Sequence, residues 1–156
     1  MRDVLEIEIK ASLEKVAALF ADPQRTPEWM QDTEYQPLTG KAGEPGSRYQ
    51  LTQREGKITF VATVVRLQLP REVEILLEAP KLRVSVTGRF TPSSPTSTQL
   101  ISEEVFRFKG AINKIFGLLA FPAIKAAHRR QMQSFKRFAE CEASSGVKGR
   151  PTAARD

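Results

Sequence analysis

A chain of 156 residues, 40% of them hydrophobic and 27% charged, predicts one soluble globular domain with a core of ordinary size. The only cysteine, Cys141, excludes a disulfide within the chain, and the only histidine, His128, argues against a zinc site made of Cys and His. We therefore expect no metal, no cofactor and a reducing, cytoplasmic compartment. The N-terminal segment lacks a signal-peptide core, and the longest apolar run, residues 115–124, is shorter than the ~20 residues of a membrane span.

The formal net charge of +6 is concentrated late in the chain. Residues 109–142 carry seven Lys and Arg against two Asp and Glu, whereas residues 1–108 carry 14 against 15. A basic segment of this kind occurs in proteins that bind nucleic acid or anionic lipid, but cations late in a helix also favour its dipole and remain solvated. The segment has no nucleic-acid motif and no interleaved exposed aromatics, so we expect no DNA binding and favour a solvated face.

The chain begins with a strand and two short helical segments. Between Leu5 and Ile9 apolar and charged residues alternate, which predicts a half-buried strand over residues 4–10 with its odd-numbered side chains facing the core. Ser12 is a suitable N-cap for a short helix that ends before the first proline. Residues 22–30 contain two prolines and the only tryptophan, and they predict one further helical turn.

Six strands are predicted from residue 33 onward, separated by turns rich in glycine, proline and serine. Consecutive strands with short connections favour an antiparallel meander. Apolar and polar residues alternate most clearly from Leu82 to Phe90, so one face of the sheet is expected to be in water. The expected strands are residues 33–39, 47–55, 57–69, 72–78, 81–91 and 98–108.

A long amphipathic helix over residues 111–142 is the last predicted element. Its apolar positions recur three or four residues apart on one face, as at Ile124, His128 and Met132, while most cations fall elsewhere. At ~1.5 Å per residue the helix is about 45 Å long, enough to lie across a whole sheet. Pro122 predicts a kink or two abutting helices. Residues 144–156 have little to bury and predict a flexible basic tail after a single domain over residues 1–143.

Three segments resemble the SRPBCC superfamily, which is also called START-like, and in particular its polyketide cyclase/dehydrase-like branch. They are residues 7–16 (IEIKASLEKV), 20–29 (FADPQRTPEW) and 132–140 (MQSFKRFAE), and the resemblance spans about residues 3–142. It implies an α+β helix-grip fold, in which a curved antiparallel sheet of about seven strands wraps a long C-terminal helix, with two short helices between strands 1 and 2. Members hold lipids, sterols, quinones, polyketides or plant hormones in an apolar cavity between sheet and helix, and some catalyse cyclisation or dehydration. The resemblance therefore implies a cavity but no particular reaction.

Glu104 and His128 are the candidate catalytic residues. The strand over residues 98–108 places Glu104 on a face that is usually apolar in the family, where burial would raise its pKa, although a register slip of one residue would turn Glu103 inward instead. His128 lies on the apolar face of the long helix and titrates near neutrality. The two side chains would transfer protons in an enzyme, or Glu104 would anchor a hydroxyl or carbonyl group of a bound ligand. Otherwise Glu104 is a paired or solvated carboxylate and His128 a packing residue.

Large apolar residues are expected to line or cap the cavity, or, for about half of them, simply to pack in the core. Motifs of nucleotide-dependent, nucleophilic and metal-dependent enzymes do not occur in the sequence. The candidate ligand-binding residues are Trp29, Tyr49, Phe60, Phe90, Phe106, Phe116, Phe121 and Ile124.

Three functional hypotheses follow. The first is a monomer or homodimer that binds or transports a small hydrophobic ligand, such as a lipid, quinone or polyketide-like compound. The second is a cyclase or dehydratase-like enzyme that uses Glu104 and His128 on a polyketide or related carbonyl compound. The third is an interaction protein whose basic helix face contacts an anionic membrane, RNA or another protein, in which case binding should weaken steeply with salt.

Overall fold

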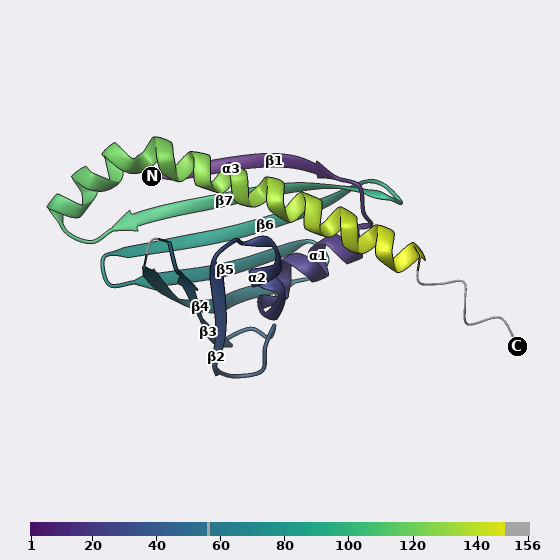
Figure 1. The fold of residues 1–156 in the computed structure, drawn as a ribbon, viewed down its shortest axis with the longest axis horizontal. Coiled ribbons are helices and arrows are strands. Elements are labelled where there is room, and N and C mark those ends of the chain that lie inside the picture. Colours follow the sequence, from purple (N-terminus) through teal and green to yellow (C-terminus); the bar gives the residue numbers. More distant parts are fainter. Residues whose placement is uncertain (56, 149–156) are drawn as a thin grey trace, which may run out of the picture.

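The computed structural model describes residues 1–55 and 57–148. It has the α+β architecture that the resemblance implies: a seven-stranded antiparallel sheet with a long C-terminal helix lying across one of its faces (Figure 1). In chain order the elements are β1 (Arg2–Ile9), α1 (Leu13–Ala21), the 3-10 helix η1 (Pro23–Arg25), α2 (Thr26–Trp29), β2 (Thr33–Thr39), β3 (Arg48–Gln53), β4 (Ile58–Gln68), β5 (Glu72–Ala79), β6 (Leu82–Ser94), β7 (Ser97–Phe108) and α3 (Ala111–Lys148).

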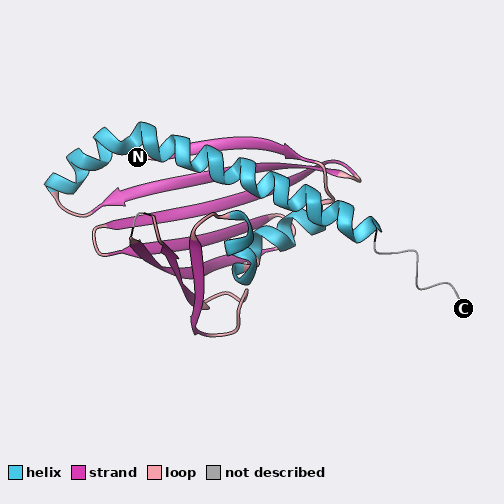
Figure 2. Ribbon diagram, viewed as in Figure 1, coloured by secondary structure: helices cyan, strands magenta, loops and turns pink. Residues whose placement is uncertain are grey.

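The sheet is a meander that β1 completes at one edge. Its strand order is β1-β7-β6-β5-β4-β3-β2, and every neighbouring pair is antiparallel. The register shifts within β2, β4 and β6, between Pro37 and Thr39, Val64 and Arg66, and Pro92 and Ser94. Such bulges bend strands, and the sheet accordingly curls around the side that carries the helices (Figure 2). The predicted meander is therefore confirmed, with the strand ends displaced by at most three residues.

The two short helices sit where the sequence places them. The Ser12 hydroxyl accepts a hydrogen bond from the Lys15 N–H at 3.4 Å and caps α1. The apolar face of α1 puts the Phe20 ring into an aromatic cluster with Trp29 of α2 and Phe135 of α3, whose ring centroids lie 5.1–6.1 Å apart. This cluster joins all three α-helices in the main hydrophobic core.

The second half of helix α3 has an inward and an outward face. Met132, Phe135 and Ala139 are buried against the sheet and α1, as the predicted spacing requires. The second half is held by polar contacts as well: the Ser134 hydroxyl donates to the Trp29 carbonyl at 2.6 Å, and the Lys10 N–H donates to the Glu140 carboxylate at 2.8 Å. The inward face of α3 thus forms one wall of the space that the curved sheet surrounds.

Pro122 bends α3 but does not divide it into two helices. Secondary structure continues through Pro122 as one helix rather than two, and Figure 1 shows α3 bent, its first turns (green) set at an angle to the rest. Pro122 removes one backbone hydrogen bond, which accounts for a bend without a break. The helix ends at Lys148, beyond the expected end at residue 142 and past the predicted start of the tail at residue 144. The remainder of the predicted tail, residues 149–156, lies outside the described residues.

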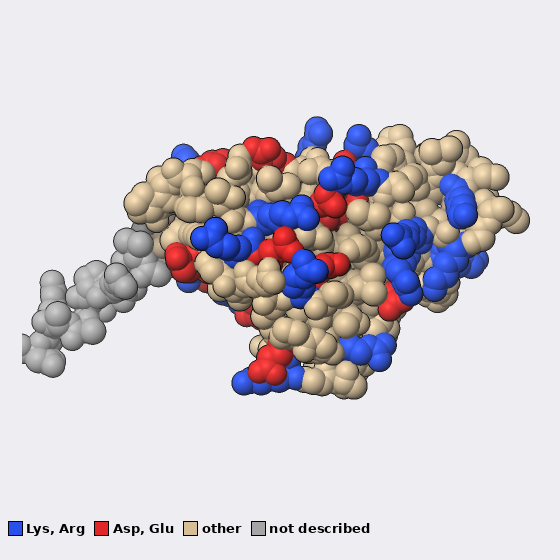
Figure 3. All heavy atoms as spheres, turned by 180° about the vertical axis from the view of Figure 1, so that it is seen from behind, with Lys and Arg blue, Asp and Glu red and all other residues tan. Residues whose placement is uncertain are grey.

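The outer face of the sheet carries interleaved charges. Glu72 accepts from Arg66 and Arg89 at 3.1 and 3.2 Å, and Glu103 pairs with Arg2 at 2.6 Å. Figure 3 shows this face, with acidic and basic side chains side by side in its centre. The expectation of one wet sheet face is therefore confirmed. No helix within the described ranges combines the length and the hydropathy that crossing a bilayer requires.

Candidate ligand-binding site

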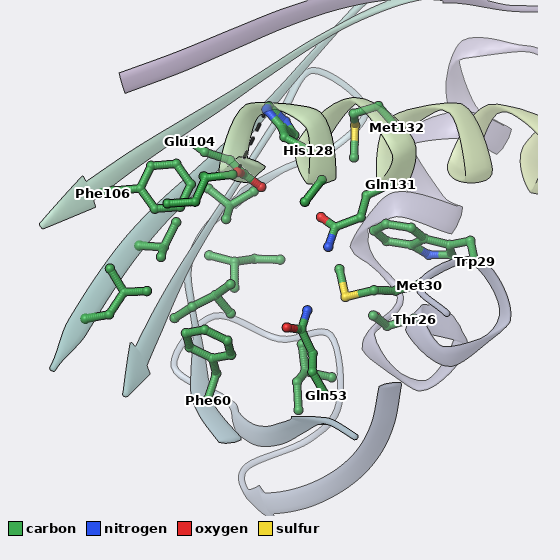
Figure 4. Close-up of a pocket in the computed structure, with 18 of the residues that line it drawn as sticks. Thr26, Trp29, Met30, Gln53, Phe60, Glu104, Phe106, His128, Gln131 and Met132 are labelled. Carbon is green, nitrogen blue, oxygen red and sulfur yellow. Dashed lines mark ion pairs between the residues drawn. The ribbon is translucent and has the colours of Figure 1, made fainter. Parts of the chain in front are cut away.

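A cavity of about 220 Å³ lies between the inner face of the sheet, α2 and the inward face of α3 (Figure 4). It is smaller than the ~300–1,000 Å³ of typical ligand pockets, so it suits a compact molecule. Most of its wall is apolar, contributed by β3 to β7 and by the three α-helices. Five of the predicted ligand-binding residues line it: Trp29, Tyr49, Phe60, Phe106 and Ile124.

Three other predicted lining residues lie elsewhere, which corrects the sequence analysis. Phe90 is 3% exposed and packs edge-on against Phe20 in the core, because Gly88 beside it brings β6 close to α1. Phe121 packs edge-on against Phe106 and is not part of the cavity wall. Phe116 is 65% exposed, because it lies on the outward face of α3. The apolar period of this helix alone did not tell which of its first turns pack on the sheet.

Glu104 is the acidic group of the cavity. Even-numbered residues of β7 face α3, so the register that turns Glu104 inward is the observed one, and Glu103 faces Arg2 on the outer side. Burial raises the pKa of the Glu104 carboxyl; the Asp3 carboxylate adds to this rise, and His128 opposes it. The Glu104 Oε2 atom lies 3.8 Å from His128 Nδ1. Glu104 thus presents a carboxyl group with a raised pKa to a mostly apolar space.

His128 is committed to two other buried side chains. Its Nδ1 lies 2.9 Å from Asp3 Oδ2, and its Nε2 lies 2.9 Å from Ser102 Oγ. Because a carboxylate only accepts, Nδ1–H donates to Asp3, and in the neutral imidazole Nε2 then accepts from the Ser102 hydroxyl. His128 and Ser102 are 1% exposed and Asp3 is 5% exposed. Although the ring borders the cavity, both of its nitrogens are engaged, and His128 positions its neighbours rather than offering a free proton donor.

Ser102, His128 and Asp3 are hydrogen-bonded in the sequence of a Ser-His-Asp catalytic triad. Ser102 is nevertheless not placed to act as the nucleophile. Ser102 is fully buried and does not line the cavity, so its Oγ has no access to a bound molecule. The arrangement is better explained as a closed polar network that fixes β1, β7 and α3 to one another. In the described part of the chain, no group of three or more His, Cys, Asp and Glu is placed to hold a metal ion.

The cavity contains polar side chains that the sequence analysis missed. Gln53 of β3 and Gln131 of α3 extend toward each other across the cavity, and Thr26 of α2 lies beside them (Figure 4). Gln53 shares its strand face with Tyr49, and Gln131 lies one helical turn from His128, so their spacing was an available signal. Asp3 lies two residues before Leu5, so the rule that odd-numbered residues of β1 face the core also applies to it.

Tyr49 and Trp29 are two further residues of the cavity wall that carry a polar atom. Burial raises the pKa of Tyr49, so its phenol remains neutral at ordinary pH. The indole N–H of Trp29 is the one fully buried side-chain nitrogen or oxygen, among the described residues, that has no partner within the protein. Tyr49 therefore adds a polar residue to a wall that also holds Glu104, Gln53 and Gln131, whereas the Trp29 nitrogen is covered by the protein.

An open groove leads away from the cavity between α3, α2 and the strand β3. It shares Trp29, Gln53 and Gln131 with the cavity, so the two are continuous. The basic helix face predicted from the sequence forms one side of this groove, through Lys125, Arg129, Arg130 and Arg137. Cations therefore stand at the mouth of the cavity, whereas its interior is apolar.

Comparison with known proteins agrees with this architecture. The family described as "Polyketide cyclase / dehydrase and lipid transport" matches residues 4–140. No curated protein matches the sequence.

Three solved structures with this fold illustrate the likeness, each at low sequence identity to the chain. A START superfamily protein from Mycobacterium smegmatis superposes with a TM-score of 0.70 at 16% identity, covering 92% of this chain and 97% of that one. A protein from Thermus thermophilus gives 0.71 at 15% identity, covering 94% and 99%. Norcoclaurine synthase from Thalictrum flavum, in complex with dopamine and hydroxybenzaldehyde, gives 0.66 at 13% identity, covering 88% and 86%. At these identities the likeness concerns the fold.

Proposed function

This chain belongs to the polyketide cyclase/dehydrase and lipid transport family, and we propose that it binds and carries a small hydrophobic ligand in the cavity between the sheet and α3. The observation that carries the proposal is the cavity itself, whose wall is apolar except for a few inward-pointing polar groups. Burial of apolar surface then supplies most of the affinity. The part of the ligand that lies inside the cavity is compact, since the cavity volume is about 220 Å³ and the space beyond it is an open groove.

Glu104 orients the ligand in this proposal. A carboxyl group with a raised pKa is protonated over a wider pH range, so it donates to a carbonyl or, through its other oxygen, accepts from a hydroxyl. The side-chain amides of Gln53 and Gln131 provide further hydrogen bonds. A ligand with an apolar body and one or two hydroxyl or carbonyl oxygens fits this wall. A ligand bearing a charge inside the cavity does not, because the apolar wall would leave that charge unsolvated.

Two small aromatic probes test the proposal, naphthalene and 2-naphthol, which differ only in a hydroxyl group. Calorimetric titration should show both binding, with 2-naphthol favoured by about two- to tenfold, the usual net value of one hydrogen bond. In Glu104→Leu the preference should disappear while naphthalene affinity is kept. Ala127→Phe fills the cavity wall and should weaken both probes; Ala123→Phe, exposed on the same helix, is the matched control. Undiminished binding to Ala127→Phe would place the probes elsewhere.

A second function, a cyclase or dehydratase-like enzyme, is favoured specifically by the environment of Glu104. General acid–base catalysis needs a group whose pKa is shifted toward the working pH, and burial shifts Glu104 in that direction. His128 would act here through its contacts with Asp3 and Glu104, as a positioning residue. Incubation with poly-β-carbonyl compounds and detection of water loss by mass spectrometry tests this function. An enzyme loses turnover in Glu104→Gln with probe affinity kept within a few fold, whereas a carrier has no turnover to lose.

A further inference from the structure

The first turns of α3 expose apolar side chains where a helix on a sheet would normally hide them. Five large residues, which we name the apolar start of α3, are 62–73% exposed: Ile112, Ile115, Phe116, Leu118 and Leu119. Together they cover the outward half of about two helical turns, one after another along the helix. Contiguous exposed apolar surface of this kind marks an interaction site more often than scattered single residues do.

Contacts on the opposite side hold this segment in place with its apolar half outward. Gly117 faces the Phe108 ring so closely that a Cβ at this position would lie 2.4 Å from a ring carbon. The Asn113 side chain donates to the Lys109 carbonyl at 2.6 Å, and the Lys109 N–H donates to the Lys81 carbonyl at 3.0 Å. The start of α3 is thereby fixed to the ends of β7 and β6, and its exposed half does not turn inward.

The chain segment that contains the apolar start of α3 carries charges of one sign. Lys109 and Lys114 are exposed in this segment, Lys81 is exposed beside Lys109, and residues 105–139 contain no Asp or Glu. In Figure 3, Lys and Arg side chains also gather on the right, at the end of the molecule where α3 begins. The centre of the sheet differs, because its arginines are paired with glutamates. Such an apolar patch with lysines beside it is complementary to a partner with a negatively charged outer layer and an apolar interior. The lysines would face the charged layer, and the apolar side chains would enter the interior.

We propose that the apolar start of α3 docks the protein on an anionic lipid bilayer. The five apolar side chains enter the boundary between headgroups and acyl chains, to the depth of ~5–10 Å typical of interfacial helices. The lysines remain at the level of the anionic headgroups. This surface differs from the basic helix face around Arg129 and Arg130, which borders the groove and carries no large apolar residues.

Other occupants fit these observations less well. A second copy of the chain meeting this patch face to face would bring two sets of lysines together with no acidic residue between them, which costs energy at an interface. Single-stranded nucleic acid binds through aromatic stacking platforms, whereas four of the five exposed side chains are aliphatic. A bilayer accepts both the aliphatic side chains and the cations.

Co-sedimentation of the full chain with vesicles tests the proposal. The vesicles are phosphatidylcholine alone, or phosphatidylcholine with about one-third phosphatidylglycerol, whose negative surface attracts cations within about a Debye length. The protein should sediment with the anionic vesicles and much less with the neutral ones. Ile115→Ser/Leu119→Ser should weaken this binding by at least about tenfold, and Lys114→Gln by about fivefold. All three substituted side chains are exposed, so the thermal midpoint of unfolding should remain unchanged.

The matched control is Leu38→Ser/Val65→Ser, which removes two exposed apolar side chains from β2 and β4 instead. This variant should bind anionic vesicles like the unaltered chain. The proposal is overturned if the unaltered chain does not sediment with anionic vesicles, or if the α3 and control variants bind equally. It is also overturned if light scattering shows a dimer that Ile115→Ser/Leu119→Ser converts to a monomer while no variant binds vesicles.

Discussion

Glu104 is held between two groups with opposite effects on its charge, inside a wall that disfavours ionisation. Burial is the largest cause of its raised pKa, Asp3 on β1 adds to it, and His128 on α3 reduces it. A carboxyl group that binds its proton more tightly in the folded state makes the free energy of unfolding fall with rising pH. The fall begins near the unfolded pKa of about 4.3 and ends above the raised folded pKa.

Glu104→Gln removes the pH-dependent contribution of this carboxyl to the free energy of unfolding. As pH rises from the unfolded pKa to above the folded pKa, the variant should therefore gain stability relative to the unaltered protein. Urea unfolding at a series of pH values measures the difference. Glu103→Gln on the same strand should instead lose stability relative to the unaltered protein as pH rises, because Arg2 holds the pKa of Glu103 below its usual range. The unaltered Glu103 therefore stabilises the fold at higher pH and loses this effect on acidification. A difference for Glu104→Gln that is flat with pH would contradict the assigned environment.

Asp3 is the residue on which the buried network depends. Asp3→Ala leaves the His128 Nδ1–H without its acceptor in a site where water does not replace it. We expect a loss of about 2–4 kcal/mol in the free energy of unfolding. Glu6→Ala on the exposed side of the same strand should change it by less than about 0.5 kcal/mol. Similar effects of the two substitutions would mean that the network contributes little.

At the scale of the element, Gly117 decides how closely α3 approaches the sheet. Replacing a helical glycine by alanine ordinarily stabilises a protein by about 1 kcal/mol. Here the added Cβ would meet the Phe108 ring, so Gly117→Ala should destabilise the chain. In a Phe108→Ala background the same change should become stabilising, because the obstacle is gone. Urea unfolding of the unaltered protein, the two single variants and the double variant measures both effects. If Gly117→Ala changes the free energy of unfolding with the same sign in both backgrounds, the close packing is contradicted.

The helix also shows where sequence reasoning succeeds and where it stops. The period of Ile124, His128 and Met132 correctly predicted the inward face, because a helix buries one stripe whatever it packs against. The same period could not show that Phe116 is exposed, since its turns extend past the inner wall of the sheet and only the tertiary arrangement reveals this. Likewise Pro122 predicted a disturbance, while the choice between a bend and a break depends on the packing around it.

At the scale of the whole molecule, the alternating strands and the final amphipathic helix predicted an antiparallel sheet with a helix across it, since each element has only one face to bury. The resemblance to the SRPBCC superfamily implied the helix-grip arrangement of these elements. The alternation of β7 left two registers open, and the one that turns Glu104 rather than Glu103 inward is the one observed. The partners of His128 were not, because Asp3, Ser102 and His128 are separated by up to 125 residues and meet only in the fold. The size of the cavity was equally inaccessible, as it depends on how Phe60, Phe106 and Met132 pack.

The central claim is that this cavity holds a compact apolar molecule. Native mass spectrometry of the protein, gently purified from its own source and then extracted with solvent, tests it most directly. The account predicts a stoichiometric small adduct that extraction removes, carrying a hydroxyl or carbonyl group for Glu104, and that Ala127→Phe does not retain. A bare protein mass, unchanged after incubation with a panel of lipids, quinones and polyketide-like compounds, would contradict it.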